Sequence, residues 1–265
     1  MITVFGSINM DLIATTQRLP KPGETVSGTG FSTAAGGKGA NQALAARRAG
    51  ADVRMSGAVG RDGFAEPALA LLKQAGTDLS DVKQTNEPTG TALILVGADG
   101  ENMIAVVPGA NGTMTAEDAD AAIAKLSPGD IVMLQFEIPA PAVERMLNAA
   151  REKGVTTVLN LAPLIEDAAR LGRLADVVIA NETEFERLAG EDGMDSAARE
   201  AALKRLHAET GQTIIVTLGA DGVIAARGGA LHRSAGLKLE PVDTVGAGDT
   251  FCGYFAAGLA DRLAF

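Results

Sequence analysis

Residues 130–161 read DIVMLQFEIPAPAVERMLNAAREKGVTTVLNL, a short apolar segment, a longer amphipathic segment and a second short apolar segment. The apolar segments at 130–136 and 155–161 have the length of buried strands. The segment between them, 141–154, spaces its apolar residues as one face of a helix does and ends at a glycine. A strand, a helix and a strand in this order predict a parallel sheet that helices cover on both faces.

The same alternation continues on both sides of this stretch. Upstream, three elements are predicted: a helix entered from a Gly-rich loop at 35–50, a strand at 53–60 and a helix at 64–76. Downstream, the predicted elements are helices at 167–174 and 182–190 and strands at 176–181 and 213–219. We therefore expect a single α/β domain over residues 1–265, with three layers and a mostly parallel central sheet.

Two segments depart from the alternation. Residues 11–33 hold short extended pieces around the sequence PKPGE, and residues 89–107 read as a hairpin that turns at Asp99 and Gly100. Both segments flank sequence that is expected at one end of the main sheet. They predict a small accessory β-sheet that forms a lid over a crevice at the strand ends.

The composition excludes several classes of protein. The chain has 265 residues, 46% of them apolar, and its net charge of −10 makes nucleic acid or an anionic membrane a poor partner. A single cysteine, Cys252, rules out an internal disulfide, and two distant histidines, His207 and His232, form no zinc pattern. The N-terminal residues lack a basic region and a long apolar run, so no membrane span is predicted and the cytoplasm is the expected location.

The sequence VDTVGAGDTF, at 242–251, places Asp249 where a glycine-rich turn enters a helix. Apolar residues recur every four positions after it and predict a helix with one buried face: Phe251, Phe255, Leu259 and Leu263. One interpretation of Asp249 is a helix cap that accepts free backbone N–H groups. The other is a catalytic base beside an anion site formed by the N–H groups of Gly246, Ala247 and Gly248.

Other polar residues follow predicted strands in the same way. In GGKGANQA, at 36–43, the glycines allow close approach of a ligand and Lys38 and Asn41 supply donors, although a plain turn has the same composition. In GSINMDL, at 6–12, Asn9 and Asp11 project to the same side of an extended chain and could hold neighbouring hydroxyls of a polyol, or simply form a turn.

Three further positions have the same ambiguity. NETE, at 181–184, is a good capping pair between Asn181 and Glu184, or places Glu184 at a magnesium-bound phosphate. TLGADG, at 217–222, is a hairpin turn or a nucleotide contact, and Glu137 ends the strand at 130–136. Because an open α/β sheet binds ligands at the carboxyl ends of its strands, these positions together predict one site at that edge.

The segments GSINMD, GGKGANQA, NETE, TLGADG and DTVGAGDTF, in this order and at these intervals, resemble the ribokinase-like carbohydrate kinase family. The resemblance runs from residue 2 to the last residue. It implies the ribokinase-like three-layer α/β/α fold with a small β-sheet lid. It also implies transfer of the γ-phosphate of ATP to the 5-hydroxyl of D-ribose.

The resemblance further implies a role for each matching residue. The sugar would be held by Asn9, Asp11, Gly37, Lys38, Asn41 and Glu137. Asp249 would be the base, beside an anion hole of Gly246, Ala247 and Gly248. The nucleotide would contact Asn181, Thr217, Gly219 and Gly222. Glu184 would bind Mg²⁺, directly or through water, and K⁺ would lie near Asp243 and the carbonyl of Val245. Pairing of the small sheets into a homodimer is a further expectation, as are additional helices that follow residue 265, close the adenine pocket and complete the potassium site.

Alternative functions remain open at this point. Within the family, the substrate could be another sugar or a nucleoside, although a 3% aromatic content offers little surface for stacking a base. A sugar-binding protein without turnover is a second alternative. A nicotinamide-dependent dehydrogenase is disfavoured, because no stretch fits the GxGxxG fingerprint followed by an acidic residue.

Overall fold

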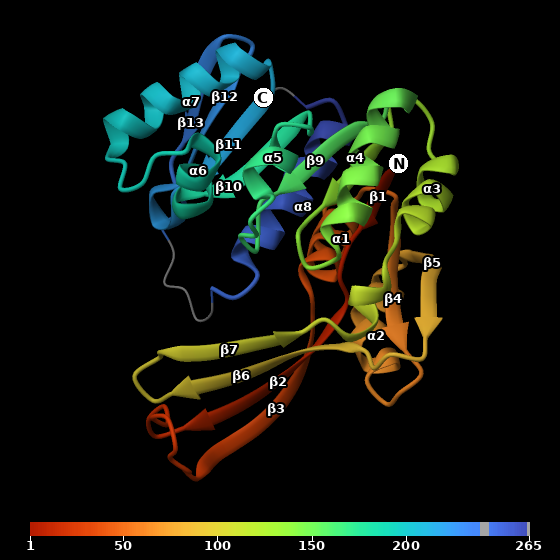
Figure 1. Cartoon of the computed structure of the whole chain (residues 1–265), viewed down its shortest axis with the longest axis vertical. Coiled ribbons are helices and arrows are strands. Elements are labelled where there is room, and N and C mark those ends of the chain that lie inside the picture. Colours follow the sequence, from red (N-terminus) through yellow and green to blue (C-terminus); the bar gives the residue numbers. More distant parts are fainter. Residues whose placement is uncertain (239–243, 264–265) are drawn as a thin grey trace.

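The computed structural model of the chain describes residues 1–238 and 244–263, and its centre is a nine-stranded sheet (Figure 1). In spatial order its strands are β13 (Ala230–Ser234), β12 (Val223–Arg227), β11 (Thr213–Thr217), β10 (Val177–Asn181), β9 (Thr156–Asn160), β8 (Ile131–Leu134), β1 (Ile2–Phe5), β4 (Val53–Gly60) and β5 (Asp78–Thr85). Neighbours from β11 to β5 pair in parallel, whereas β12 and β13 add an antiparallel hairpin at one edge. The mostly parallel sheet is confirmed.

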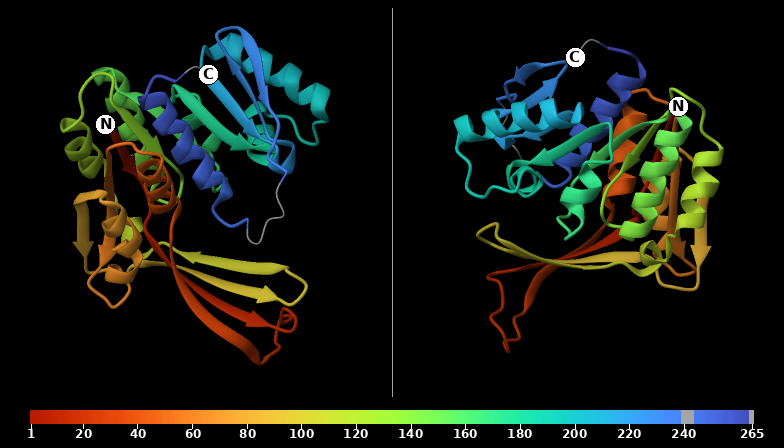
Figure 2. Two further views of the ribbon diagram at one scale, coloured as in Figure 1. Left: turned by 180° about the vertical axis from the view of Figure 1, so that it is seen from behind. Right: turned by 45° about the horizontal axis from the view of Figure 1, so that its top comes forward.

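Helices cover both faces of this sheet (Figures 1 and 2). One face carries α1 (Lys38–Arg48), α2 (Ala65–Ala75) and α8 (Ala247–Ala260). The other carries α3 (Ala116–Ala124), α4 (Ala140–Lys153), α5 (Ala168–Gly172), α6 (Glu182–Ala189) and α7 (Ser196–Thr210). The strands feed two separate cores because successive side chains point to opposite faces. In β8, for example, Ile131 and Met133 pack on the α1 side and Val132 and Leu134 on the α4 side.

A second sheet of four strands projects from the end of the large one, at the carboxyl ends of its parallel strands (Figure 1). In spatial order it contains β3 (Gly28–Gly36), β2 (Asn9–Thr16), β6 (Gly90–Gly97) and β7 (Asn102–Val107). β2 and β6 pair in parallel and the outer pairs are antiparallel. This is the small sheet that was predicted in addition to the main one, and β2 continues directly from β1.

Helix α8 differs from the prediction in the face that it buries. Its buried residues are small: Asp249, Cys252, Gly253, Ala256 and Ala257. The predicted stripe is only partly covered, and Leu263 is 67% exposed. The reason is the contact with α1, where a Cβ on Gly253 would lie 2.5 Å from the Cβ of Ala45 and 2.6 Å from the carbonyl oxygen of Gln42. Among residues 1–238 and 244–263, no helix combines the length and apolar character that a membrane span requires.

Candidate active site

The glycines of GGKG bring the N-terminus of α1 against the loop that follows β1. Gly37 is the N-cap of α1 and has a φ of 91°, and a Cβ there would lie 2.7 Å from the backbone nitrogen of Asn9. A Cβ on Gly39 would lie 2.6 Å from the nitrogen of Ser7. Both close contacts are with backbone, which cannot move aside as a flexible side chain does. The two predicted sugar-binding segments, 6–12 and 36–43, are therefore packed together.

Glu137 joins these two segments. Its Oε2 accepts hydrogen bonds from the Ser7 hydroxyl (2.6 Å), the Lys38 backbone N–H (3.0 Å) and the Asn9 side-chain amide (3.4 Å). The Lys38 N–H is at the first residue of α1, so the helix N-terminus also favours the negative charge. Asn9 is fixed from its other side, because its Oδ1 accepts from Asn111 Nδ2 at 2.7 Å. Ser7 and Asn111 are members of this cluster that sequence reasoning missed.

Asp11 lies on β2 and faces a cavity between the small sheet and helices α1 and α8 of the main domain. The cavity measures about 910 Å³, and Asn41, Ile94, Gly246 and Tyr254 also line it. Burial, together with the nearby charge of Glu137, raises the pKa of Asp11 to about 6. A Cβ at Gly36 would lie 2.4 Å from Asp11 Oδ1, so a larger residue there would displace the carboxylate from this position.

Asp249 is in the first turn of α8, but its described hydrogen bonds go to α1. Its Oδ2 accepts from Asn41 Nδ2 and its Oδ1 from Gln42 Nε2, each at 3.0 Å. The N-cap of the helix is Gly246, with a φ of 75°. These contacts argue against the capping interpretation of Asp249. They place the carboxylate of Asp249, a residue that is only 7% exposed, between α1 and the N-terminus of α8.

The predicted anion hole is formed by the residues that open α8. Ala247 and Gly248 are exposed, and the Ala247 N–H donates to the carbonyl of Thr244 (3.1 Å) in the turn before the helix. An anion bound at this N–H would therefore have to share the hydrogen bond with the Thr244 carbonyl or displace that carbonyl. The helix N-terminus still carries the positive end of the macrodipole.

Asp249 itself lines a second cavity, of about 160 Å³. This cavity brings together the predicted phosphate and nucleotide residues Asn181, Glu184 and Thr217 with Gly246, Ala247, Gly248 and Asp249. Lys38, which was predicted to hold the sugar, also lines this cavity. Gly219 and Gly222 belong to the adjacent turn around η2 (Gly219–Asp221), which joins β11 and β12 as a hairpin. Neither lines this cavity in the described part of the chain.

Asn181 and Glu184 form the capping pair at the start of α6. The Glu184 N–H donates to Asn181 Oδ1 at 2.8 Å, and the two oxygens of Glu184 accept from the backbone and side-chain nitrogens of Asn181 at 2.9 and 3.0 Å. Burial raises the pKa of Glu184 above its ordinary value. The cap is thus confirmed, and the same carboxylate also lines the cavity.

The donors present suit a magnesium ion that arrives with its nucleotide. In the described part of the chain, no three His, Cys, Asp or Glu side chains come together as a preformed metal site. Mg²⁺ in kinases is commonly held by one or two carboxylates together with substrate phosphates and water, a mode that needs no preformed cluster. Glu184 in the cavity fits that mode. For K⁺, Asp243 lies outside the described residues, and Val245 is described with 73% of its surface exposed.

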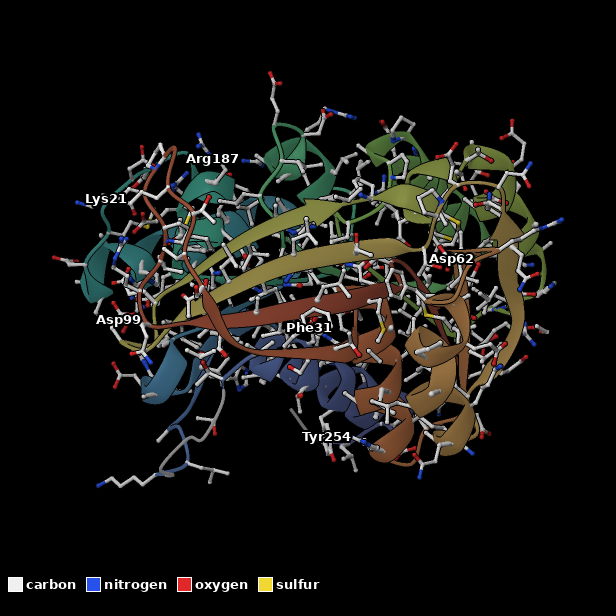
Figure 3. The ribbon with its side chains drawn as sticks, turned by 90° about the horizontal axis from the view of Figure 1, so that it is seen from below. Lys21, Phe31, Asp62, Asp99, Arg187 and Tyr254 are labelled. Carbon is white, nitrogen blue, oxygen red and sulfur yellow. The ribbon has the colours of Figure 1, made fainter. Side chains whose placement is uncertain are left out.

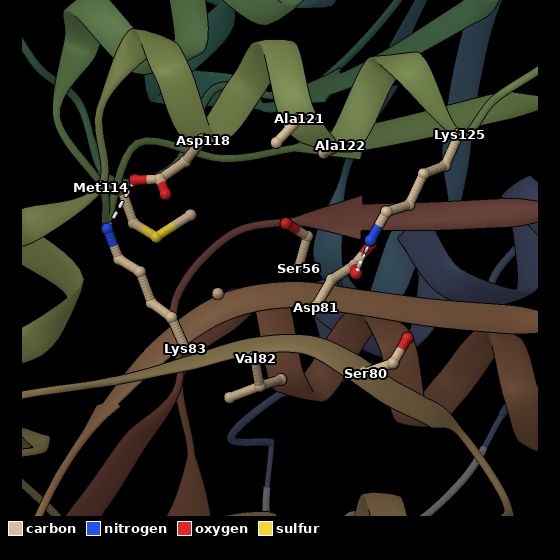
Figure 4. A pocket seen from close by; sticks show the side chains of 11 residues that line it. Ser56, Ser80, Asp81, Val82, Lys83, Met114, Asp118, Ala121, Ala122 and Lys125 are labelled. Carbon is tan, nitrogen blue, oxygen red and sulfur yellow. Dashed lines mark hydrogen bonds and ion pairs between the residues drawn. The ribbon is translucent and has the colours of Figure 1, made fainter.

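A separate cavity between β5 and α3 contains none of the predicted site residues in the described chain (Figure 4). It measures about 180 Å³ and is flanked by the ion pairs Lys83–Asp118 and Lys125–Asp81. Its charged groups are thus already paired with each other. The site at the strand ends, by contrast, gathers polar groups from many elements.

The comparisons with known proteins agree with the fold. The pfkB family carbohydrate kinase model matches residues 1–264. The chain is 36% identical over 265 residues to a ribokinase of Haemophilus influenzae, covering all of this chain and 87% of that protein. It is 35% identical over 263 residues to a deoxyribokinase of Salmonella typhi, covering 96% of this chain and 84% of that protein. A structure of Arabidopsis thaliana ribokinase complexed with ribose and ATP superposes with a TM-score of 0.87 at 31% identity, covering 99% of this chain and 86% of that one. The chain belongs to the pfkB family of carbohydrate kinases.

Proposed function

We propose that the protein is an ATP-dependent kinase that phosphorylates the 5-hydroxyl of D-ribose, giving ribose 5-phosphate and ADP. The proposal rests on the position of Asp249. Its carboxylate accepts a hydrogen bond from Asn41 of α1, and the residue itself lies in the first turn of α8. A base is thereby held beside Asn41, which lines the larger cavity, and at the N-terminus of a helix. The ribokinase relatives support ribose as the substrate.

The residues of the chain supply positioning, a proton acceptor and positive potential. Asn9, Asp11, Gly37, Lys38, Asn41 and Glu137 would hold the sugar. Asp249 takes the proton of the 5-hydroxyl. At the same time the hydroxyl oxygen forms a bond to the γ-phosphorus, and the bond from that phosphorus to the β-phosphate oxygen breaks. ADP leaves with the electron pair of the broken bond. The N-terminus of α8 stabilises charge on the transferred group, which is the main requirement of phosphoryl transfer.

Two cations complete the proposal. Mg²⁺, held by Glu184 directly or through water, would neutralise charge on the nucleotide phosphates. K⁺ would lie near Asp243 and the Val245 carbonyl, and Asn181, Thr217, Gly219 and Gly222 would contact the nucleotide. We further propose that the reaction takes place in the cytoplasm, where ATP is available.

The test is ADP release in the presence of ATP, Mg²⁺ and K⁺ with a panel of ribose, 2-deoxyribose, hexoses and nucleosides. The highest kcat/KM is expected with ribose. The panel includes 2-deoxyribose because a deoxyribokinase is among the relatives. A higher kcat/KM with another acceptor would replace ribose, and ribose binding by calorimetry without ADP release would replace the kinase with a sugar-binding protein.

The titration of Asp11 gives a pH-dependent prediction. Its pKa is raised from 3.8 to about 6 on folding, so between these values the folded state binds more protons than the unfolded chain. The wild-type protein therefore loses folding stability as the pH rises through this window, and the loss is complete above about pH 6. The Asp11→Asn variant has no carboxyl group to ionise at this position, so its folding stability should not fall in this way. We expect its Tm to exceed the wild-type Tm at about pH 8 and to equal it near pH 4.

Thermal melts at a series of pH values measure this difference, and ribose titrations of the same samples measure its functional counterpart. The ionised carboxylate accepts hydrogen bonds from sugar hydroxyls, so Asp11→Asn should raise KM for ribose at neutral pH. A Tm difference that is independent of pH would show that Asp11 does not titrate in this range. An unchanged KM would remove Asp11 from the sugar site.

We also propose a homodimer formed through the small sheets. One face of this sheet is apolar and is viewed from below in Figure 3, where Phe31 is labelled. Phe31 is 71% exposed and pairs with Ala14, and Leu93 and Met103 on the neighbouring strands are also exposed. A sheet face with so much exposed apolar surface is expected to be covered by a partner.

Phe31→Glu is expected to convert the dimer into a monomer, because it places a charge on the covered face. Phe64→Glu is the matched control, since Phe64 is a partly exposed phenylalanine at the N-cap of α2, outside the small sheet. Analytical ultracentrifugation measures both. A monomeric wild-type protein, or a dimer that survives Phe31→Glu alone, would contradict the proposed interface.

A further inference from the structure

A chain of buried side-chain amides runs from the large sheet to Asp249. Gln135 lies directly after β8 and is 0% exposed, and its Nε2 donates to Oε1 of Gln42 at 2.6 Å. Gln42, on α1, is 1% exposed and donates through Nε2 to Asp249 Oδ1 at 3.0 Å. The same nitrogen is 3.3 Å from Oδ1 of Asn160, at the end of β9. Asn160 is fixed in turn by a bond from its Nδ2 to the carbonyl of Ile179 at 3.2 Å.

The direction of these hydrogen bonds is set by the charge of Asp249. An ionised carboxylate only accepts, so Gln42 presents its NH₂ group to Asp249 and its oxygen to Gln135. Gln135 must then donate, which turns its own oxygen towards Gly6. That oxygen has no hydrogen-bond partner among the described residues, and a Cβ at Gly6 would lie 2.1 Å from it, so a larger residue at position 6 would displace this amide. Each amide in the chain thus fixes the orientation of the next.

The two oxygens of Asp249 have different partners as a result. Oδ1 is held by Gln42, which is deeply buried and linked to two strands of the large sheet. Oδ2 is held by Asn41, a half-buried residue that also lines the sugar cavity. A sugar hydroxyl that enters this cavity can replace the Asn41 contact, whereas the contact with Gln42 is out of its reach.

We infer that Gln42 is a positioning residue for phosphoryl transfer, supported by Gln135 and Asn160. It anchors Asp249 through Oδ1 and leaves Oδ2 as the oxygen that takes the proton of the sugar hydroxyl. The inference rests on the proposed function, in which Asp249 is the base. Orientation matters because proton transfer requires the acceptor oxygen within hydrogen-bond reach of the hydroxyl, and a displacement of about 1 Å can cost about a hundredfold in rate.

The test compares three Gln→Met variants, which keep the side-chain length and remove the amide. Gln42→Met loses the direct anchor, and Gln135→Met loses only the group that orients Gln42. The control is Gln212→Met, because Gln212 is also a buried glutamine with a hydrogen-bonded side-chain amide. Its Nε2 donates to the carbonyls of Gly172 and Ala175, away from the site. For each variant, kcat, KM for ribose and for ATP, and Tm are measured.

We expect kcat to fall by about tenfold to a hundredfold in Gln42→Met and by about fivefold or more in Gln135→Met, with both KM values within about threefold of wild type. Gln212→Met should lose Tm but retain kcat. A structural role alone would instead lower Tm in all three variants and spare kcat in the fraction that folds. Gln135→Met keeps the inference testable if Gln42→Met does not fold.

The outcomes separate this inference from the proposed function. A wild-type protein that releases ADP, together with Gln42→Met and Gln135→Met variants of normal kcat, would overturn the inference and leave the kinase intact. A wild-type protein that binds ribose and releases no ADP would overturn the kinase, and the positioning role with it. Equal losses of kcat in Gln212→Met and Gln135→Met would assign the effect to packing and also overturn the inference.

Discussion

Replacing Asp249 with asparagine is expected to lower kcat by about 10²-fold to 10⁴-fold, the range of a lost general base. Asparagine has nearly the same shape but does not accept the hydroxyl proton. Its amide still leaves the N-terminus of α8 in place, so binding of the nucleotide should be little affected. KM for ATP is therefore expected to change by less than about threefold, and the loss to lie in kcat.

A helix cap would behave in the opposite way. If Asp249 only stabilised the first turn of α8, the variant would keep its turnover and nearly all of its Tm, because asparagine caps a helix about as well as aspartate does. Steady-state kinetics and a thermal melt on the same preparation distinguish the two. The matched control is Asp195→Asn, because Asp195 is a true N-cap whose Oδ1 accepts from the Ala198 N–H at the start of α7. Near-normal kcat in Asp249→Asn would remove the residue from the chemistry.

Gly37→Ala is expected to have the second large effect. It should lower the free energy of unfolding by about 3 kcal/mol, because strain at positive φ and overpacking each cost about 1–3 kcal/mol. We also expect KM for ribose to rise about tenfold or more. The φ of Gly37 is 91°, and the new Cβ would lie 2.7 Å from Asn9 N and 3.0 Å from Ile8 Cα. Relief of this clash must move α1 away from the loop after β1. Lys38 and Asn41 on α1 and Asn9 on the loop would then separate.

Gly50→Ala provides a matched control for this variant. Gly50 also has a positive φ, 97°, but a Cβ there meets no described atom within 4 Å. Its substitution should cost only the backbone strain, about 1–2 kcal/mol, and leave KM unchanged. Denaturant unfolding and ribose kinetics measure both variants. Equal losses of stability, with unchanged KM in each, would show that the close contact at Gly37 does not position the sugar site.

The alternation of strands and helices was predictable because the buried strands are short apolar runs and the helices carry clear stop signals. The edge strand β5, sequence DLSDVKQT, was not predicted, since its residues are largely half-buried or exposed and form no apolar run. Strands β12 and β13, which follow the predicted turn at 217–222, were missed for a similar reason. Edge strands owe their structure to a neighbour's backbone, which leaves little trace in their own side chains.

The predicted face of α8 packs against the core but is only partly buried, because helix packing selects small residues as well as apolar ones. The periodicity of Phe251, Phe255 and Leu259 marks a face that is only half covered, on which the rings of Phe251 and Phe255 stack at 6.3 Å. The close contact instead uses Gly253, Ala256 and Ala257. A glycine in a helix signals such a contact only when the facing helix is known.

The edge of the sheet where the candidate site lies was predictable, but the partners of its residues were not. Asp249 remained ambiguous between base and cap, since the side chains that resolve the question, Asn41 and Gln42, lie 208 and 207 residues away in the chain. Gln135 had a sequence signal, a polar residue in the otherwise apolar run IVMLQF. Its significance depends on Gln42 lying opposite, which is a property of the fold.

The continuity of β1 with β2 divides the work of the site between two structural units. Asp11, Ile13 and Ile94, which line the larger cavity, belong to the small sheet. Asp249 and the N-terminus of α8 belong to the main domain, together with Lys38 and Asn41 of α1, two of the residues proposed to hold the sugar. The part of the proposed acceptor pocket that the small sheet supplies can therefore change without a change in the residues proposed for phosphoryl transfer. A chimera that carries the small sheet of a relative with another substrate should change which sugar is accepted while it keeps the same transfer chemistry. A modular division of this kind gives one catalytic scaffold access to many acceptors.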